Sequence, residues 1–567
     1  MKGIHKGNNL FHSFKEFSIP PGSSTTFNNS TNVVNIINRV TGGNISNIDG
    51  LIKANGSANL FLINPTGIVF GENASLDIGG SFLGSTAESI LFEDGFEFSA
   101  VNAQIEPLLT ISVPLGLQMG QNPSSIQVNG TGHNLRGGFP FNATGSRGSN
   151  ELRVKPGKTL GLIGGEITIN GGVLSGEAGI IQLGAIGSQN SNSLVSLIST
   201  NTGWNFNYES INSFAPIQLT QKALIDASGI QTGTIQLNGS EVEIANGSWV
   251  FVENQGDRIA GDIRLNATES LIVRGESDDQ SVPTRVYNYT RSTGEGGESQ
   301  IITPKLSILE SANVLTNTTG AGNSGNINVV ATESLVVDGS LTGVDFSTVS
   351  TLSASTTGIG NSGDITISTG KLMIFPGGQI TSLTGFGTGK AGDITINAEE
   401  SIDIIARKGD SRGNTLTSSS SFGEGAAGKI ELNTQKLSLL EGGGILVTNV
   451  GSGQGGDIVL NVSESLEMSG QNFRPDFGVL PSRITASTDI PSSRAMRIFG
   501  LSPIPSASSG NITIDTPNLI LDNTAEIRIR NQGIGNGGTL NINANRVSLN
   551  NQSNILATTN SGTGGNI

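Results

Sequence analysis

Four aspartates that occupy the same place in a repeated pattern are the first candidates for chemistry in this sequence. Each follows a glycine and precedes an isoleucine, and they are Asp262, Asp364, Asp393 and Asp457. Carbohydrate-active enzymes cleave glycosidic bonds with a pair of carboxylates held close together. The pattern therefore leaves a polysaccharide lyase or hydrolase open as one function class. One acid per repeat beside a turn glycine is explained more simply as a feature of the repeat itself.

The histidines and cysteines limit this chemistry further. The three histidines are His5, His12 and His133, and the chain has no cysteine. Because no histidine lies in the repeated part, a histidine-based triad or zinc site is excluded there. No phosphate-binding loop occurs, and the nonapeptide calcium repeat does not recur back to back. The sequence therefore predicts no catalytic residue, no bound metal and no cofactor.

A second group of residues has the composition of a contact surface. Arginine and aromatic side chains are enriched in contact hot spots, and they gather between residues 471 and 508 of an otherwise acidic chain. The candidate contact loop consists of Phe473, Arg474, Phe477, Arg483, Arg494, Arg497 and Phe499. A similar group earlier in the chain consists of Arg285, Tyr287, Tyr289 and Arg291. A solvated loop without a partner remains the alternative for both groups.

The repeated pattern that must position these residues becomes regular after about residue 215. A glycine, one variable residue and then apolar-x-apolar recurs, as in Gly363-Asp364-Ile365-Thr366-Ile367. The glycines of this pattern include Gly233, Gly261, Gly325, Gly363, Gly392, Gly428, Gly456, Gly510 and Gly538. Short intervals are 28 or 29 residues, as between 233 and 261. Longer ones are 36 residues between 392 and 428, 38 between 325 and 363, and 54 between 456 and 510. The intervals predict coils of about 28–38 residues.

Each interval holds short runs with one apolar face, which predicts three strands per coil. One such coil cannot bury its own apolar face, so coils must stack into a solenoid. Period-2 alternation, β-branched residues and frequent glycine disfavour helix. We therefore predict an all-β, right-handed parallel β-helix, the hand following from the crossover preference of parallel strands. The extra residues of the long intervals, about 276–298, 343–358, 407–425 and 471–508, are expected to emerge from one corner.

The first 215 residues show the same winding with one interruption. Apolar runs such as Val33–Ile37, Leu60–Ile63 and Leu160–Ile163 alternate with glycine and asparagine corners. Between residues 104 and 150 prolines interrupt the apolar pieces, which predicts an excursion from the coil as a side sheet or hairpin. We therefore divide the chain into a domain of residues 1–215 and a β-helical stalk of residues 216–567.

Composition and charge exclude several partners. The chain has 31 Lys and Arg residues against 46 Asp and Glu residues, a net charge of −15. Phosphate binding needs a basic surface, so no nucleic-acid partner is expected. No stretch approaches the roughly 20 apolar residues of a membrane span, so the chain is not expected to cross a membrane. Apolar residues make up 35% of the chain and are regularly placed, which argues against disorder.

One turn near the start of the chain shows how the winding turns its corners. Asn64-Pro65-Thr66-Gly67 separates the apolar runs Leu60–Ile63 and Ile68–Phe70. Proline presets φ at the second position of a turn, asparagine bonds its own backbone, and glycine accepts a positive φ. Two short buried strands around a tight corner indicate a chain that winds round an axis rather than a hairpin.

This turn is one of several ordered motifs that resemble a known family. The others are Asn9–Phe14, Arg39–Gly43, Gly80–Phe82, Leu109–Leu117 and Val154–Leu160. In this order they resemble the secretion domain of filamentous haemagglutinin-type exoproteins, the exported partners of two-partner secretion systems. The family turn usually reads Asn-Pro-Asn-Gly, and Thr66 replaces its second asparagine here. A second Asn-Pro motif of some relatives has no clean match, because the nearest segment, Asn28–Thr31, lacks the proline.

The resemblance implies a function for the whole chain. Residues 1–215 would be a secretion domain and β-helix nucleus, with Asn64, Pro65, Thr66 and Gly67 as the secretion motif. A partner outer-membrane β-barrel transporter would deliver the chain to the cell surface or the medium, where it acts as an adhesin for a glycan or a cell-surface receptor. Family members begin with a signal peptide, which Met1–Gly7 does not resemble, so we expect a chain clipped at both ends. A carbohydrate-active β-helix enzyme is the alternative.

Overall fold

The computed structural model describes residues 3–102, 110–138, 142–148, 150–189, 193–200, 203–340, 349–385, 387–406, 416–474 and 478–567. Strands dominate these residues, and the one helix among them is α1 (Ser493–Phe499). The chain divides into two compact units. The first comprises Met1–Glu253, Gly261–Leu271 and Ser277–Thr284, and the second comprises Asn254–Ala260, Ile272–Glu276 and Arg285–Ile567.

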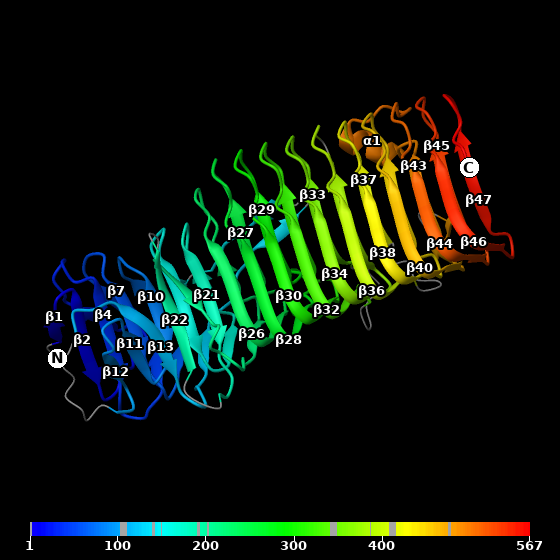
Figure 1. Ribbon diagram of the computed structural model, residues 1–567. Coiled ribbons are helices and arrows are strands. Elements are labelled where there is room, and N and C mark those ends of the chain that lie inside the picture. Colours follow the sequence, from blue (N-terminus) through cyan, green and yellow to red (C-terminus); the bar gives the residue numbers. More distant parts are fainter. Residues whose placement is uncertain are drawn as a thin grey trace. The chain divides into compact units, whose positions relative to one another are not determined.

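The second unit is a parallel β-helix in which each coil contributes one long and one short strand (Figure 1). The long strands stack as β30 (Ser299–Leu309), β32 (Ile327–Asp338), β34 (Ile365–Ile374), β36 (Ile394–Ile405), β38 (Ile430–Leu440), β40 (Ile458–Ser469), β44 (Ile512–Asp522) and β46 (Leu540–Leu549). The short strands stack as β29 (Arg285–Thr290), β31 (Asn313–Thr318), β33 (Ser350–Thr356), β35 (Gly378–Thr384), β37 (Leu416–Ser421), β39 (Gly444–Asn449), β43 (Arg483–Thr488), β45 (Glu526–Asn531) and β47 (Asn554–Thr559). Neighbours in both stacks pair in parallel, which confirms the predicted parallel β-helix.

Two of the three apolar faces of a coil lie on one continuous strand. In β32, Ile327 belongs to the first face and Leu335 to the second, and both are fully buried. Between the faces the pairing register shifts, for example between Ala331 and Ser334. The sequence predicted two separate strands here. The backbone ladder continues through the bend, so the two faces form one long strand.

The interior of the second unit is a column of aliphatic side chains. Its members are register partners from coil to coil, each at most 1% exposed: Ile327, Ile365, Ile394, Ile430, Ile458, Ile512 and Leu540. Full burial of such a side chain stabilises the fold by about 1.5–3 kcal/mol. Because neighbouring coils provide the contacts, each coil gains a core only through stacking.

Glycine begins each repeat because the backbones of successive coils nearly touch there. A β-carbon on Gly363 would lie 2.0 Å from the carbonyl oxygen of Gly325, and one on Gly428 would lie 2.1 Å from that of Gly392. Neither glycine has a positive φ. The close approach of the coils, not backbone conformation, therefore explains the repeated glycine.

The variable residue after that glycine bonds the next coil. The side-chain Oδ1 of Asn326 accepts the backbone N–H of Asp364 at 2.9 Å, and Oδ1 of Asp364 accepts that of Asp393 at 2.8 Å. Oδ1 of Asp393 accepts the N–H of Lys429 at 2.7 Å. Asn and Asp are frequent at this position because each supplies an acceptor one coil further on.

The long intervals differ from the prediction because each contains a short strand. β29, β33, β37 and β43 lie inside the segments predicted as insertions. Among them β37 lacks apolar alternation and reads Leu-Thr-Ser-Ser-Ser-Ser. Thr417 and Ser419 are nevertheless fully buried, so small hydroxyl side chains take the place of aliphatic ones. The extra residues of each long interval therefore lie partly before and partly after its short strand. In the last of these intervals, α1 follows β43.

The first unit winds in the same way with shorter strands. One face stacks β2 (Asn9–Phe14), β4 (Asn35–Val40), β7 (Asn59–Ile63), β10 (Phe82–Ser85), β18 (Thr159–Gly164), β21 (Ile180–Ala185) and β26 (Thr234–Ala245). A second stacks β5 (Ser46–Ile48), β8 (Ile68–Phe70), β14 (Ile126–Asn129), β19 (Ile167–Asn170), β24 (Ile217–Thr220) and the end of β26. Third-face strands are β3 (Ser24–Phe27), β6 (Leu51–Ala54) and β9 (Ser75–Asp77), then β17 (Leu152–Arg153), β20 (Val173–Ser175), β25 (Leu224–Asp226) and β27 (Trp249–Asn254). β28 (Ile263–Arg274) follows, with the buried Ile263.

The excursion from the coil is larger than residues 104–150. A five-stranded antiparallel sheet combines β11 (Ser89–Phe92), β12 (Glu97–Ser99), β13 (Pro114–Met119), β22 (Ser193–Thr200) and β23 (Gly203–Asn207). A separate hairpin joins β15 (Arg136–Gly138) and β16 (Asn142–Thr144). Between them β14 returns to the coil, pairing with β8 and β19. The predicted side sheet and hairpin both exist, but the sheet also recruits residues 193–207, which the sequence analysis assigned to regular winding.

Candidate functional site

The Asn64–Gly67 turn is a corner of the first unit between β7 and β8. Oδ1 of Asn64 accepts the backbone N–H of Thr66 at 3.0 Å, and its carbonyl oxygen accepts the N–H of Gly67 at 3.1 Å. Gly67 has a φ of 129°, a value that favours glycine. The turn therefore has the local bonding that the sequence predicts.

Bonds to neighbouring coils hold the turn in place. The side-chain amide of Asn64 donates to the carbonyl oxygen of Asn44 and to Oγ of Ser46, both at 2.9 Å. On the other side Oγ of Ser124 donates to the carbonyl oxygen of Pro65 at 2.6 Å. Asn64 is fully buried, whereas Pro65 and Thr66 are half-buried. The folded turn therefore presents no polar atom of Asn64 to a partner.

Two further motifs supply a buried ladder of asparagines. The amide of Asn35 donates to Oδ1 of Asn9 at 2.9 Å, and that of Asn59 donates to Oδ1 of Asn35 at 3.0 Å. The backbone N–H of Ser81 donates to Oδ1 of Asn59 at 2.9 Å. Residues from four successive windings thus meet in one hydrogen-bonded row, which the spacing alone does not reveal. Two of them, Asn9 and Ser81, belong to the motifs.

Arg39 fastens the side sheet to the coil. Its Nε donates to Oγ of Ser13 at 3.1 Å, and its Nη1 donates to the carbonyl oxygen of Ser99. The guanidinium lies 4.4 Å from the centre of the Phe98 ring, a cation–π contact. Burial lowers the pKa of Arg39. The side chain is 7% exposed, so this motif residue positions the five-stranded sheet rather than facing solvent.

The sequence of this chain was compared with those of known protein families. The sequence model of the TPS secretion domain family matches residues 2–244, the part of the chain that holds the turn, the ladder and Arg39. Residues 2–244 therefore contain the secretion domain of a two-partner secretion exoprotein. No curated protein sequence matches it.

One solved structure resembles the exoprotein over most of its length. The crystal structure of the HMW1 secretion domain from Haemophilus influenzae matches at 15% identity, covering 98% of this chain and 97% of that one. Its TM-score is 0.25, too low to support an argument about the fold. The parallel β-helix follows from the pairing of the strands themselves.

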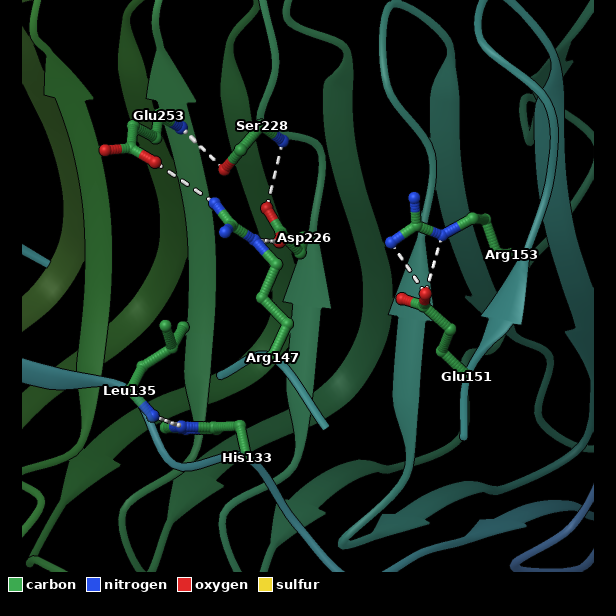
Figure 2. A network of polar contacts seen from close by, with 8 residues as sticks. All are labelled: His133, Leu135, Arg147, Glu151, Arg153, Asp226, Ser228 and Glu253. Atoms are coloured by element: carbon green, nitrogen blue, oxygen red, sulfur yellow. Dashed lines mark hydrogen bonds and ion pairs between the residues drawn. The ribbon is translucent and has the colours of Figure 1, made fainter. Parts of the chain in front are cut away.

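A polar network holds the excursion hairpin of the exoprotein against the third face of the first unit (Figure 2). Nε of Arg147 bonds Oδ2 of Asp226, and its Nη2 lies 3.1 Å from Oε2 of Glu253. Both carboxylate side chains are at most 4% exposed. Burial opposes the charge on Arg147, but the two carboxylates more than offset it and raise its pKa. These residues are not evident from the sequence, because no spacing signal links positions 79 and 106 residues apart.

His133 lies in the same excursion and is fully buried. Its Nε2–H donates to the carbonyl oxygen of Gly247 at 3.0 Å, and its Nδ1 accepts the backbone N–H of Leu135 at 3.0 Å. The ring packs 5.4 Å from that of Trp249. Both ring nitrogens are occupied by these bonds, which fix the neutral form. Burial lowers the pKa of His133 to about 4.

The candidate contact loop of the second unit is divided by the structure. Phe473 lies in the hairpin of β41 (Gln471–Arg474) and β42 (Gly478–Pro481) and is 57% exposed. Arg494 and Arg497 are exposed on α1, with Phe499 at its end. Arg483 begins β43, which separates hairpin and helix by six residues, roughly 20 Å of strand. Arg474 ends β41, and Phe477 lies outside the described residues.

The earlier arginine and tyrosine group is not a contact loop. Arg285 begins β29, and Tyr287 and Tyr289 lie in the same strand. Both tyrosine rings are fully buried and stack with their centres 5.5 Å apart. The expectation of an exposed loop was wrong because the third strand of this coil lacks the apolar alternation that identifies it.

Two of the four aspartates that suggested catalysis, Asp364 and Asp393, line an open groove. Asp364, Asp393, Glu295 and Lys390 border a hollow of about 540 Å³ along the stacked corners. Oδ1 of each of these aspartates accepts a backbone N–H of the next coil. Within the described ranges no cluster of three or more His, Cys, Asp or Glu residues is arranged to hold a metal ion. Nor does any described helix have the length and apolarity to cross a bilayer.

Proposed function

We propose that the exoprotein crosses the outer membrane unwound through a partner β-barrel transporter and winds outside the cell. In this proposal residues 1–215 act as secretion domain and nucleus, and residues 216–567 form the stalk. The two-partner secretion domain implies the transporter and a secreted or surface location. Stacking drives the winding, because each coil completes the core of the one before it.

The buried state of the Asn64 turn is the observation that carries this proposal. Asn64, Pro65, Thr66 and Gly67 are the proposed secretion motif, yet every polar atom of the Asn64 side chain is bonded within the coil. A transporter therefore binds the motif before the coil closes. Once the turn closes, the motif is withdrawn and the chain is released.

Export in cells with and without the partner transporter tests this proposal. The chain is fused to a cleavable signal peptide, and the fraction in the medium is measured. Asn64→Ala combined with Pro65→Ala is expected to leave the chain in the periplasm. The Asn122-Pro123 pair, with Asn122 exposed and Pro123 half-buried, gives a matched control. Asn122→Ala with Pro123→Ala is expected to be exported normally. Normal export of the Asn64 and Pro65 variant would remove the turn from the mechanism.

We further propose that the exoprotein is a non-enzymatic adhesin for a glycan or a cell-surface receptor. The exposed residues Phe473, Arg494 and Arg497 support a contact role for the two pieces beside β43. The engagement of Asp364 and Asp393 in the backbone ladder argues for a structural role. Binding to a glycan array should fall at least about tenfold in Arg494→Ala with Arg497→Ala. Release of sugar products that needs Asp364 and Asp393 would instead favour a polysaccharide lyase or hydrolase.

A further inference from the structure

The excursion hairpin and its flanking residues reach parts of the first unit that come much later in the chain. We call residues 131–138 and 142–148 the strap. His133 bonds Gly247, which is 114 residues later, and Arg147 bonds Glu253, which is 106 residues later. The family match ends at residue 244. The strap therefore closes onto chain that lies beyond the recognised secretion domain.

The strap supplies the charge that the third face needs. Asp226 in β25 and Glu253 in β27 lie on adjacent parallel strands, with Asp226 in register with Phe251. Both side chains are at most 4% exposed, and Arg147 places its positive charge against both of them. Removal of one partner from a buried ion pair is strongly unfavourable because it leaves an uncompensated charge. Arg147 thus makes the pairing of β25 with β27 possible in its observed form.

The second anchor of the strap is built around Trp249. The indole is fully buried, and its Nε1–H donates to the carbonyl oxygen of Pro283 at 2.9 Å. The backbone N–H of Gly247 donates to Oγ1 of Thr284 at 3.0 Å. His133 packs against the Trp249 ring. Pro283 and Thr284 therefore hold the two residues that His133 contacts, in agreement with the extent of the first compact unit, which includes Ser277–Thr284.

We propose that the strap is a winding checkpoint, which closes after the coils before it and is required for β27 to pair with β25. When the first windings are complete, His133 and Arg147 still lack Gly247, Asp226 and Glu253. The chain then reaches β27, where Arg147 bonds both Glu253 and the Asp226 of the neighbouring β25. Winding past this point thus depends on a correctly placed excursion. The inference relies on the proposed function only for the order in which the chain emerges.

Pulsed hydrogen exchange during refolding of the full chain from denaturant tests the checkpoint without a transporter. In the wild type, amides of the strap and β27 are expected to become protected together, after those of β4 and β7. Arg147→Met is expected to slow protection of the strap and β27 at least about tenfold and to leave β4 and β7 unchanged. Arg153→Met is the matched control, because Arg153 pairs with the neighbouring Glu151 and is 56% exposed (Figure 2).

A rescue variant separates lost charge balance from general damage. Arg147→Met combined with Asp226→Asn and Glu253→Gln removes all three charges and is expected to restore the rate for β27 to within about threefold. If Arg147→Met does not fold at all, folding of the triple variant supports the checkpoint and failure of the triple variant contradicts it. Wild-type protection of β27 in Arg147→Met would also overturn it. These results leave the export assay unaffected, so the two proposals fail separately.

Discussion

Gly392 lies directly over Gly363, so close that a β-carbon on Gly392 would be 2.0 Å from the Gly363 carbonyl oxygen. A second glycine column runs beside the first, and a β-carbon on Gly389 would lie 2.0 Å from the carbonyl oxygen of Gly360. Real β-carbons do not approach backbone oxygens so closely, and a backbone atom cannot rotate aside as a side chain can. The stalk therefore depends on glycine at its corners as much as on isoleucine in its interior.

Gly392→Ala should destabilise the second unit, because coils must move apart to admit the methyl group. We expect a loss of about 2–3 kcal/mol in the free energy of unfolding, at the upper end of overpacking effects, measured by urea denaturation. Gly564→Ala is the control, since its β-carbon would meet its nearest neighbour at 3.8 Å. Equal stability of the two variants would show that the corners are looser than described.

Variants of Asp393 test whether the repeated aspartates have a structural or a catalytic role. Asp393→Ala removes the acceptor of the Lys429 N–H and should cost about 1 kcal/mol of unfolding free energy. Asp393→Asn keeps that acceptor and reduces repulsion with Asp364, so it should be neutral or slightly stabilising. Thermal unfolding distinguishes the two variants. A cost as large in Asp393→Asn as in Asp393→Ala would contradict the ladder.

Acid should weaken the first unit through His133. Its pKa is lowered to about 4 by burial, with the Lys222 charge acting in the same direction and the Gly247 bond opposing them. The unfolded chain then binds the proton more tightly than the folded one. His133 thus contributes its full stability above about pH 6.5 and loses it progressively down to about pH 4, a total of roughly 3 kcal/mol.

The pH effect is measured as a difference between variants, because carboxylates titrate over part of the same range. His133→Asn should reduce the drop in unfolding free energy between pH 7 and pH 4 by about 3 kcal/mol relative to the wild type. His5→Asn changes an exposed histidine and should leave the drop as it is. An identical drop in His133→Asn and wild type would rule out the buried neutral imidazole as the cause.

Arg39 gives a test of the link between the side sheet and the coil. Arg39→Ala leaves the Ser99 carbonyl oxygen without this donor and removes the contact with Phe98. We expect a loss of about 2–4 kcal/mol, together with faster proteolysis of residues 89–119. Unchanged cleavage in this segment, with the exposed Arg153→Ala as control, would mean that the side sheet is held by its apolar contacts alone.

The stacking of the stalk was predictable from sequence because the same short pattern of glycine and alternating apolar residues recurs in every coil. Glycine followed by apolar-x-apolar places Ile327, Ile394 and Ile458 in one column, and the structure confirms this column. Among the strands that were missed, β37 has its interior filled by serine and threonine. Thr417 and Ser419 are fully buried, yet their hydroxyl groups make the strand resemble a loop in sequence.

The contacts of the candidate site were less predictable, because they join distant segments. Asn64 was identified from its local turn chemistry, which needs only four residues. The Asn9, Asn35 and Asn59 ladder requires the register of three coils, and the Arg147 network requires knowledge of where the excursion returns. An isolated arginine in a polar segment carries no signal of this kind. Tertiary folding, not local propensity, decides such pairings.

Export of a cross-linked chain tests most directly the claim that the exoprotein passes the membrane unwound and is held together by stacked coils. Asn328 and Thr366 are register partners in adjacent coils, and strands about 4.8 Å apart allow a disulfide in a chain with no native cysteine. Asn328→Cys with Thr366→Cys, oxidised in the periplasm, should be retained there, while either single variant or the reduced double variant should reach the medium. Appearance of the oxidised, cross-linked chain in the medium at the level of the single variants would contradict the account.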